Sequence, residues 1–291
     1  MMPIYCTTEL RVIEAQFTQQ DLPQLAAQAI ANWVSARYPH GSTLLIAAGA
    51  GYNGVDALLS AHILQTQGYG CYLLCLGDIA DLPAAAQTAY AACINAGALL
   101  LDEVADEPPL FDLVLDGLFG IGLNRPLSGD ACAIISWINQ LGSPILALDI
   151  PSGLHPDTGC ALGVAIQADA TLSFIGLKPC LLTGPHSAAC GQVWVDHLGL
   201  SAEELPPSQG YALSAQSVKQ LIPSRARSSH KGTHGTAAIL GGAQGMMGAA
   251  LLAGRAALYA GAGKVQLGVI DTHIHVDPQQ VELQSMSASG V

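Results

Sequence analysis

Three glycine-rich segments hold the residue types that could do chemistry. Residues 49–54, GAGYNG, match the spacing G-x-G-x-x-G, in which glycines let backbone N–H groups approach a phosphate. Asp116 precedes the loop GIGLNRP (120–126), and Asp149 and Ser152 flank an Ile-Pro pair. We interpret these segments as a site for a phosphate-bearing ligand. For 49–54, the alternative is a tight turn that only starts a helix.

The side chains in these segments favour oxygen-based chemistry over a serine nucleophile. Asn53, Asp116 and Ser152 offer amide, carboxylate and hydroxyl oxygens, which a hard monovalent or divalent cation prefers. A nucleophilic serine usually has glycines two positions on either side, whereas Ser152 has Ile150 and Leu154 there. We therefore interpret Ser152 as a candidate ligand and not as a nucleophile.

Arg125 is the most informative residue of the second loop. The chain has only ten basic residues, and one of them stands beside the glycines of this loop. We interpret Asn124, Arg125 and the glycine amides as phosphate contacts; the alternative is a surface loop closed by a salt bridge. For Asn53 and Asp56, at a predicted helix start, the alternative is simple capping.

The elements that must position these loops follow a βαβ pattern. Short apolar runs alternate with alanine-rich segments of helical composition, which is typical of a parallel sheet covered on both faces. Since ligands bind outside the carboxyl ends of such strands, the three loops are expected to converge at one edge. The predicted strands are 43–48, 71–76, 112–117 and 144–150, and the predicted helices are 8–35 with a break near Pro23, 55–66, 83–95 and 130–140.

A second unit is predicted after the Pro-rich connection 200–213. It contains strand 236–242, a helix and strand 264–270, which make one βαβ unit. One crossover cannot cover both faces of a sheet, so this unit has the character of a fragment of a larger domain. We predict domains at 1–212 and 213–291, and we expect exposed core that makes the chain aggregation-prone or a homo-oligomer.

Composition excludes several classes of protein. The 291 residues carry a formal charge of −12 and a pI near 4.9, so neither a nucleic acid nor an anionic membrane surface is an expected partner. The mean hydropathy of +0.39 directs attention to the uncharged stretch 237–254. Gly241-Gly242 marks a turn there, so we predict a strand followed by a helix and not a membrane span.

The N-terminus and the cysteines point to the cytoplasm. Glu9, Arg11 and Glu14 interrupt the apolar core that a signal peptide would need. The eight cysteines form no CxxC pair, and we interpret them as small buried residues of a reducing compartment, without disulfides or zinc.

Five segments occur in an order that is typical of one family. They are Gly49-x-Gly51-x-Asn53-Gly54-x-Asp56, VLDGLFGIGLNRPLSG (114–129), ALDIPSGLHPDTG (147–159), ADATLSFIGLKP (168–179) and GQVWVDHLG (191–199). This order resembles the NAD(P)H-hydrate epimerase family. The resemblance implies a Rossmann-like parallel three-layer α/β sandwich that binds K⁺ and NAD(P)HX, the hydrated form of NADH or NADPH.

The resemblance also implies a set of site residues. The implied K⁺ ligands are Asn53, Asp116 and Ser152. The implied substrate contacts are Tyr52, Asn53, Gly54, Val55, Asp56, Gly120, Ile121, Gly122, Leu123, Asn124, Arg125, Pro126 and Asp149. The reaction would reverse the configuration of a hemiaminal carbon. As a hypothesis, the hydroxyl leaves and returns through an iminium, with Asp149 as the catalytic group that moves the proton and Lys178 as a helper.

The glycine turn departs from the family pattern. Where the family has Asn-Asn-Gly-Gly-Asp-Gly, this chain has Tyr52-Asn53-Gly54-Val55-Asp56-Ala57, and the family's Leu-Met-Glu-x-Ala appears as residues 25–29, LAAQA, without the Glu. These changes could narrow the pocket. The alternative to an epimerase is therefore a non-catalytic module on the same fold, which binds a nucleotide or a partner without turnover.

The second unit resembles a different domain of the same repair system. Residues 230–269 look like the opening of the ADP-dependent NAD(P)H-hydrate dehydratase domain, which implies an incomplete ribokinase-like α/β fragment. The family's later ADP-site motifs have no counterpart before Val291. We therefore expect ADP or ATP to serve only a complete dehydratase domain. A remaining alternative is a metal site at 271–275, DTHIH, which resembles the first amidohydrolase motif; that class needs further ligands downstream.

Overall fold

The computed structural model describes residues 2–269, except for 18, 102–103, 105–106, 202, 223 and 244. The chain divides after Ser217 into two compact units. The domain boundary predicted after residue 212 stays a prediction, and the 271–275 motif lies outside the described residues.

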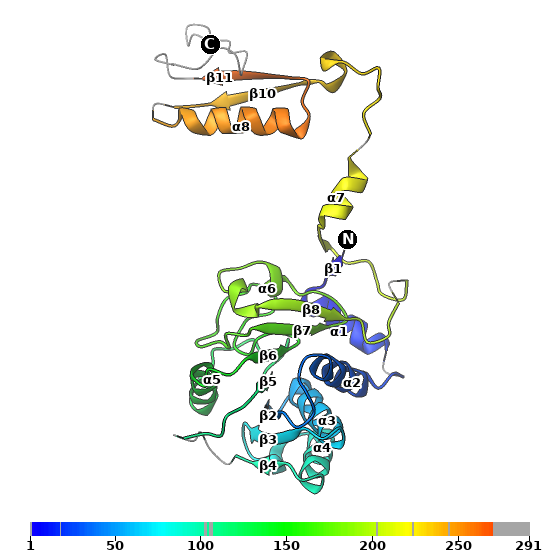
Figure 1. The fold of residues 1–291 in the computed structure, drawn as a ribbon, viewed down its shortest axis with the longest axis vertical. Coiled ribbons are helices and arrows are strands. Elements are labelled where there is room, and N and C mark those ends of the chain that lie inside the picture. Colours follow the sequence, from blue (N-terminus) through cyan, green and yellow to red (C-terminus); the bar gives the residue numbers. More distant parts are fainter. Residues whose placement is uncertain are drawn as a thin grey trace. The chain divides into compact units, whose positions relative to one another are not determined.

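A seven-stranded parallel sheet forms the centre of the first unit (Figure 1). The strands are, in spatial order, β4 (Leu99–Leu100), β3 (Gly70–Cys75), β2 (Thr43–Ala48), β5 (Leu113–Gly117), β6 (Ile145–Leu148), β7 (Ala170–Phe174) and β8 (Gln192–Asp196). The four predicted apolar runs are β2, β3, β5 and β6. The predicted α/β fold class is therefore confirmed.

Helices cover both faces of this sheet and make three layers. They are α1 (Thr7–Gln16), α2 (Leu22–Ser35), α3 (Tyr52–Thr66), α4 (Ala84–Asn95), α5 (Asp130–Gln140) and α6 (Pro179–Leu182), with short 3₁₀ turns η1 (Ile79–Asp81) and η2 (Ser187–Cys190). Alternate strand residues face opposite layers. Leu44 and Ile46 of β2 pack in the core under α1 to α4, whereas Leu45 and Ala47 pack in the core under α5. This double burial explains why the strands are continuous apolar runs.

The strand order reverses between β2 and β5. From β2 the chain proceeds to β3 and β4, and from β5 it proceeds to β6, β7 and β8 on the other side. The loops after β2 and β5 therefore diverge, and a crevice opens at the carboxyl ends of these two strands. Both the GAGYNG turn and the second glycine-rich loop begin there.

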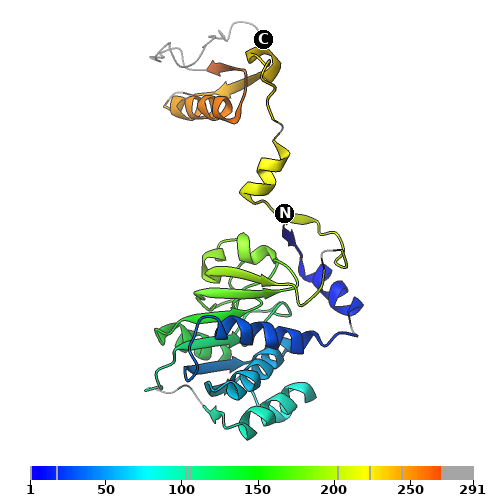
Figure 2. The same ribbon diagram turned by 45° about the vertical axis from the view of Figure 1, so that its right-hand side comes forward.

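The N-terminal segment lies against the connection to the second unit. Strand β1 (Met2–Ile4) pairs antiparallel with β9 (Gly210–Ala212), so this part of the predicted connection has regular structure. Helix α1 follows β1, and its Leu10 and Ile13 share the core of α2 on the same side of the sheet (Figure 2). The segment thus carries α1 to the carboxyl edge of the sheet.

The described part of the second unit is a βαβ unit. After α7 (Ala215–Leu221), which spans the division between the units, come η3 (Lys231–His234), β10 (Thr236–Gly241), α8 (Met247–Ala260) and β11 (Lys264–Val269). Strands β10 and β11 are parallel, and α8 packs on them through Ala250. Leu252 and Tyr259 of α8 are exposed. In the described part of the chain, no helix is long and apolar enough to cross a membrane.

The buried thiols of the first unit are predicted to be unreactive in the native protein. Burial raises the pKa of Cys71 and Cys93 to about 12, and that of Cys75 and Cys190 to about 11. A pKa three units above the ordinary value lowers the thiolate fraction about a thousandfold at about pH 8. Maleimide is expected to label the exposed Cys160 first, as read by peptide mass spectrometry.

The control is labelling in denaturant, where all eight thiols are expected to react. Labelling of Cys71 or Cys93 as fast as Cys160 in the native protein would contradict their burial.

Candidate active site at the carboxyl edge of the sheet

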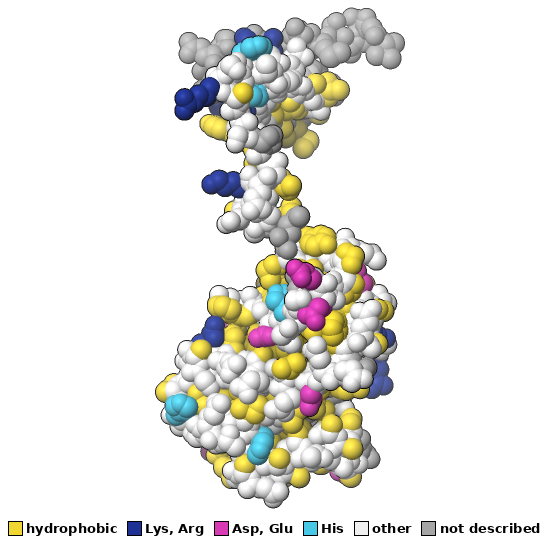
Figure 3. Space-filling view, turned by 90° about the vertical axis from the view of Figure 1, so that its right-hand side faces the viewer, with side chains coloured by type: hydrophobic (Ala, Val, Ile, Leu, Met, Phe, Trp, Pro, Cys, Tyr) yellow, Lys and Arg dark blue, Asp and Glu magenta, His cyan; other side chains and the backbone are white. Residues whose placement is uncertain are grey.

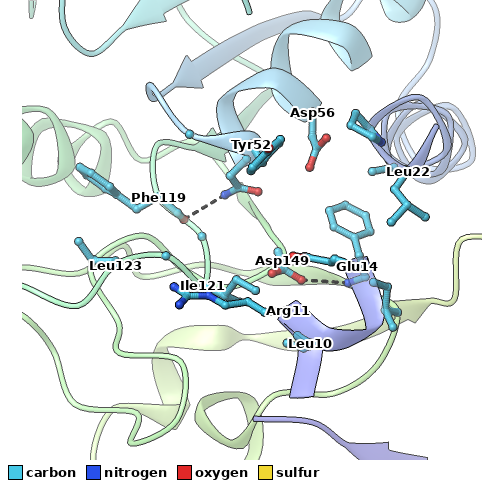
Figure 4. Close-up of a pocket in the computed structure, with 18 of the residues that line it drawn as sticks. Leu10, Arg11, Glu14, Leu22, Tyr52, Asp56, Phe119, Ile121, Leu123 and Asp149 are labelled. Atoms are coloured by element: carbon cyan, nitrogen blue, oxygen red, sulfur yellow. Dashed lines mark hydrogen bonds between the residues drawn. The ribbon is translucent and has the colours of Figure 1, made fainter. Parts of the chain in front are cut away.

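A cavity of about 950 Å³ opens where the strand order reverses (Figure 4). Its walls come from α1, α2, the start of α3, and the loops after β5, β6 and β7. This volume is at the upper end of the range for small-molecule sites, and it suits a ligand of nucleotide size. The three loops singled out in the sequence therefore meet at one cavity.

The glycine turn after β2 is shaped by close backbone contacts. A Cβ atom on Gly49 would lie 1.8 Å from the carbonyl oxygen of Leu118, and one on Gly54 would lie 1.9 Å from that of Gly49. Only glycine fits at these two positions. Gly51 is the N-cap of α3 and offers no side-chain cap, so the first N–H groups of α3 are open to a ligand at the cavity wall.

Asp149 is held in a strained and tightly bonded position. It has a φ of 65°, in the left-handed region that favours glycine, directly after β6. Its Oδ1 accepts a hydrogen bond from the N–H of Phe174 at 3.1 Å and forms an ion pair with Nζ of Lys178. Lys178 Nζ also donates to Ser173 Oγ at 2.9 Å and to the Phe174 carbonyl at 2.7 Å. Lys178 exposes 2% of its side chain and Asp149 exposes 14%, so Asp149 remains open to the cavity.

Two more carboxyl groups face this cavity. Asp56 projects from α3 and Glu14 from α1 (Figure 4). Oδ1 of Asp56 is inaccessible to solvent and has no hydrogen-bond partner among the residues that the structure describes. Burial, and then the negative charges of Asp149 and Glu14, raise the pKa of Asp56 well above its ordinary value. Burial and Asp149 also raise the pKa of Glu14, although Lys178 and Arg11 oppose this. This shift favours the protonated form of Asp56 over its carboxylate.

Basic residues are concentrated at the cavity. The first unit has nineteen acidic residues but only four basic ones. Three of these four, Arg11, Arg125 and Lys178, line the cavity, and the fourth, Arg37, stacks between Trp33 and Trp194. On the face drawn in Figure 3, charged side chains of this unit are sparse. This distribution favours an anionic ligand at the cavity.

A buried oxygen cluster lies beside the cavity. Ser152 donates to Asp116 twice, from Oγ at 2.6 Å and from N–H at 2.8 Å, and Leu118 N–H donates to Asp116 at 3.3 Å. Asn53 Nδ2 lies 3.0 Å from the carbonyl oxygens of both Phe119 and Leu148. Burial raises the pKa of Asp116 to about 6 against the effect of these hydrogen bonds. Within the described residues, no basic side chain pairs with Asp116.

Most residues of the implied substrate site line this cavity. They are Tyr52, Asn53, Asp56, Gly120, Ile121, Gly122, Leu123, Asn124, Arg125 and Asp149. Gly54 and Val55 do not line it, and Pro126 is exposed outside it. Asp116 and Ser152 are fully buried in the oxygen cluster. The functional role of each residue stays a prediction.

The departures from the family pattern have different surroundings. Val55 and Ala57 are buried and pack in the core under the helices, away from the cavity. Tyr52 is 83% exposed at the cavity, so its ring stands at the opening (Figure 4). Only Tyr52 among these three can change what the cavity admits.

Sequence reasoning missed the contribution of α1. Leu10, Arg11, Glu14 and Phe17 line the cavity, but nothing in the sequence analysis assigned them to a site. The available signal was a glutamate at helical spacing between two apolar residues, Leu10 and Phe17, on the inward side of the helix.

Helix α1 is anchored at its N-terminus by distant residues. Asp157 Oδ1 accepts hydrogen bonds from the N–H of Thr7 at 2.8 Å and from its Oγ1 at 3.0 Å. Tyr5 is buried, and its hydroxyl donates to the carbonyl of Pro206 at 2.9 Å. Glu9 accepts from the N–H of Cys6 at 2.8 Å and from that of Gln209 at 3.2 Å. These contacts hold Arg11 and Glu14 at the cavity.

The substitution Asp157→Ala is predicted to destabilise α1. It removes a capping acceptor from an orphan helix N–H, which costs about 1–2 kcal/mol in the free energy of unfolding. Urea unfolding measures this loss, and hydrogen exchange at the amides of α1 measures its location. The matched control is Thr7→Ala, which removes one of the two bonds and is expected to have a smaller effect. Unchanged exchange in α1 would contradict the anchoring role.

A parallel sheet covered on both faces, with a cavity at the point where the strand order reverses, defines the first unit as a Rossmann-like α/β protein. The solved structure of the yeast protein ynu0 (YNL200c) has this fold, with a TM-score of 0.59, 18% identity, and coverage of 74% of this chain and 98% of that chain. The family model described as YjeF-related protein N-terminus matches residues 19–180. The chain belongs to this family.

Several curated relatives are similar to this chain. NAD(P)H-hydrate epimerase of Achromobacter xylosoxidans is 43% identical over 204 residues, which cover 69% of this chain and 97% of the relative. The bifunctional NAD(P)H-hydrate repair enzyme Nnr of Coxiella burnetii is 33% identical over 272 residues, covering 92% of this chain and 55% of the relative. That of Escherichia coli is 36% identical over 253 residues, covering 86% and 49%. The chain spans about half the length of these bifunctional relatives.

Proposed function

We propose that the first unit epimerises the R and S forms of hydrated NADH and NADPH. The observation that carries the proposal is the cavity itself: it combines the basic residues of an acidic unit with three carboxyl groups, in a fold aligned with nearly the whole length of a relative named NAD(P)H-hydrate epimerase. Such a cavity suits a ligand with phosphates at one end and a reactive uncharged ring at the other.

The anionic part of the substrate is assigned to the loops. The open N–H groups at the start of α3 and the side chains of Asn124 and Arg125 are suited to phosphate oxygens. The hydrated ring then lies toward Asp149, where the carboxyl groups are. This orientation places the negative phosphates at a basic side chain and keeps them away from the carboxyl groups.

The reaction needs proton transfer at a hemiaminal carbon. The C–O bond breaks with its electron pair going to oxygen, a proton completes the departing water, and the ring nitrogen lone pair forms an iminium. The reverse addition of water needs a group that takes a proton; Asp149 lies at the cavity and is the group assigned to these proton transfers. Lys178 acts as a positioning residue, since its ion pair and two further hydrogen bonds fix the Asp149 carboxylate.

The non-catalytic alternative is not favoured. It depended on Tyr52, Val55 and Ala57, and two of these three pack in the core and not at the cavity. The carboxyl groups that the chemistry requires are all at the cavity.

We also propose that Asn53, Asp116 and Ser152 hold K⁺. The residues fit this ion because their donor set is hard oxygen, and because Asp116 is a fully buried carboxylate without a basic partner in the described residues. When bound, K⁺ would supply the missing positive charge and favour phosphate binding nearby. Asn53 and Ser152 both contact the backbone of Phe119, so the cluster also fixes the start of the second loop.

For the second unit, the proposal follows the longer alignments. An alignment of 272 residues exceeds the first unit, so it includes part of the second unit and of the second half of the bifunctional relative. We infer that this unit belongs to a dehydratase half, which would use ADP or ATP when complete. The eight free thiols, four of them buried, support a reducing compartment, the cytoplasm.

Asp149→Asn is predicted to abolish most epimerisation. The amide keeps the shape of the side chain but cannot take a proton, so the interconversion of the R and S hydrates should fall at least about 100-fold. NMR or chromatography of the two epimers measures the rate. The matched control is Asp130→Asn, an exposed aspartate on α5, which should keep the wild-type rate.

Two outcomes would count against the proposal. A wild-type rate for Asp149→Asn would remove Asp149 from the chemistry. Binding of the hydrates by the wild-type protein without interconversion would instead favour the non-catalytic module.

K⁺ is predicted to stabilise the protein against unfolding. An ion that binds only the folded state at a hundred times its Kd adds about 2.7 kcal/mol, which raises Tm by several degrees. Thermal unfolding in KCl and in LiCl at equal ionic strength measures this effect. Asp116→Asn should remove the difference between the two salts, because the carboxylate charge is lost. An equal Tm in both salts for the wild-type chain would contradict the K⁺ site.

A further inference from the structure

We propose that Asp56 is a second catalytic carboxyl group, which serves the face of the substrate ring opposite to the face served by Asp149. The inference rests on the proposed epimerase function and deepens it. It assigns one acid–base group to each side of the reacting carbon.

The chemistry of inversion requires access to both faces. Departure of the hydroxyl leaves a planar iminium, and the configuration reverses only if water adds from the other side. A single group at one side returns the oxygen to the face it left, unless the ring turns over. A ring whose phosphates are held in the loops can turn over only by rotating inside the cavity. A second group across the ring removes that need.

The structure places two carboxyl groups on separate walls. Asp149 belongs to the loop after β6, whereas Asp56 belongs to the second turn of α3. Figure 4 shows both side chains at the cavity, with Asp56 apart from Asp149 and directed toward the open space. A flat ring that enters between α3 and the end of β6 therefore has one carboxyl group on each side.

The surroundings of the two groups are different. Asp149 forms an ion pair with Lys178 and accepts a hydrogen bond from the Phe174 N–H, and both contacts stabilise its negative charge. Asp56 Oδ1 has no partner in the described residues and no access to solvent. The charged groups around it are Asp149 and Glu14; burial first, and then their negative charges, raise the pKa of Asp56 and favour its protonated form. One group is thus set as a base and the other as an acid, the pair that a two-sided proton transfer uses.

Glu14 is a positioning residue in this scheme. It projects from α1, and the charges that act on it are those of Asp149, Lys178 and Arg11. Its negative charge helps Asp56 to keep a proton. Arg125, the remaining basic residue of the cavity, belongs to the loop assigned to phosphate.

The steps balance without any further reactant. Asp56 gives its proton to the departing hydroxyl of one epimer, and water leaves. Another water then adds to the opposite face of the iminium, and Asp149 takes its proton. A proton then passes from Asp149 to solvent and from solvent to Asp56, which restores both groups. The reverse direction exchanges the two roles. The oxygen in the product therefore comes from solvent.

Exchange in ¹⁸O-labelled water distinguishes the two faces. Starting from one pure epimer and the full chain, mass spectrometry reads the oxygen and chromatography reads the configuration. Asp56→Asn is expected to slow interconversion at least about 100-fold. It should still exchange the oxygen of one epimer without inversion, through Asp149. Asp149→Asn should do the same for the other epimer, through Asp56. Exchange in buffer alone is subtracted, and Asp130→Asn is the matched control.

A separate control tests whether the variants fold. Removing an unpartnered buried carboxyl is not expected to lower Tm, and Asp56→Ser provides a second variant of smaller volume. Interconversion by Asp56→Asn at the wild-type rate would overturn the inference. So would retention of exchange for the same epimer in both the Asp56 and the Asp149 variants. Failure of the wild-type chain to interconvert the epimers is a different result, since it refutes the proposed function itself.

Discussion

The reversal of strand order between β2 and β5 is the constraint on which the site depends. Because the chain leaves these neighbouring strands in opposite directions, their loops part and a cavity opens at the carboxyl ends. The two loops still approach closely at their base, where a Cβ on Gly49 would lie 1.8 Å from the Leu118 carbonyl oxygen. Every polar group of the site is attached to an element that begins or ends at this edge. The glycines thus determine how closely the two loops approach, and the strand order determines where the cavity opens.

The buried polar groups around the cavity differ in how fully they are paired. Lys178 has three acceptors, and its burial is compensated by them. Asp116 accepts three hydrogen bonds but has no positive partner in the described residues. Asp56 has one oxygen without a partner in the described part of the chain. Since an unpaired buried polar group costs about 1–3 kcal/mol, the burial of Lys178 is better compensated than that of Asp116 or Asp56.

Helix α1 makes the site depend on contacts that are remote in sequence. Its N-terminus is held by Asp157, and the strand before it pairs with β9 in the connection to the second unit. Tyr5, which leads into α1, contacts Gly176 and bonds to Leu177, next to Lys178. One segment therefore supports both the wall that carries Glu14 and the base that holds the Asp149–Lys178 pair. Part of the connection between the units belongs to the support of the first unit's cavity.

The sequence by itself determined the strands β2, β3, β5 and β6, because strands buried on both faces must be continuous apolar runs. It also determined which loops meet, because parallel strands bring their carboxyl ends to one edge. Only the tertiary structure decided that Val55 and Ala57 face the core while Tyr52 faces the cavity, since this depends on how α3 is rotated against the sheet. It likewise decided that Glu14 and Asp56 line the cavity. A charged residue on a helix looks the same in sequence whether it meets solvent or other charges, and the raised pKa of Asp56 comes from its burial and its neighbours.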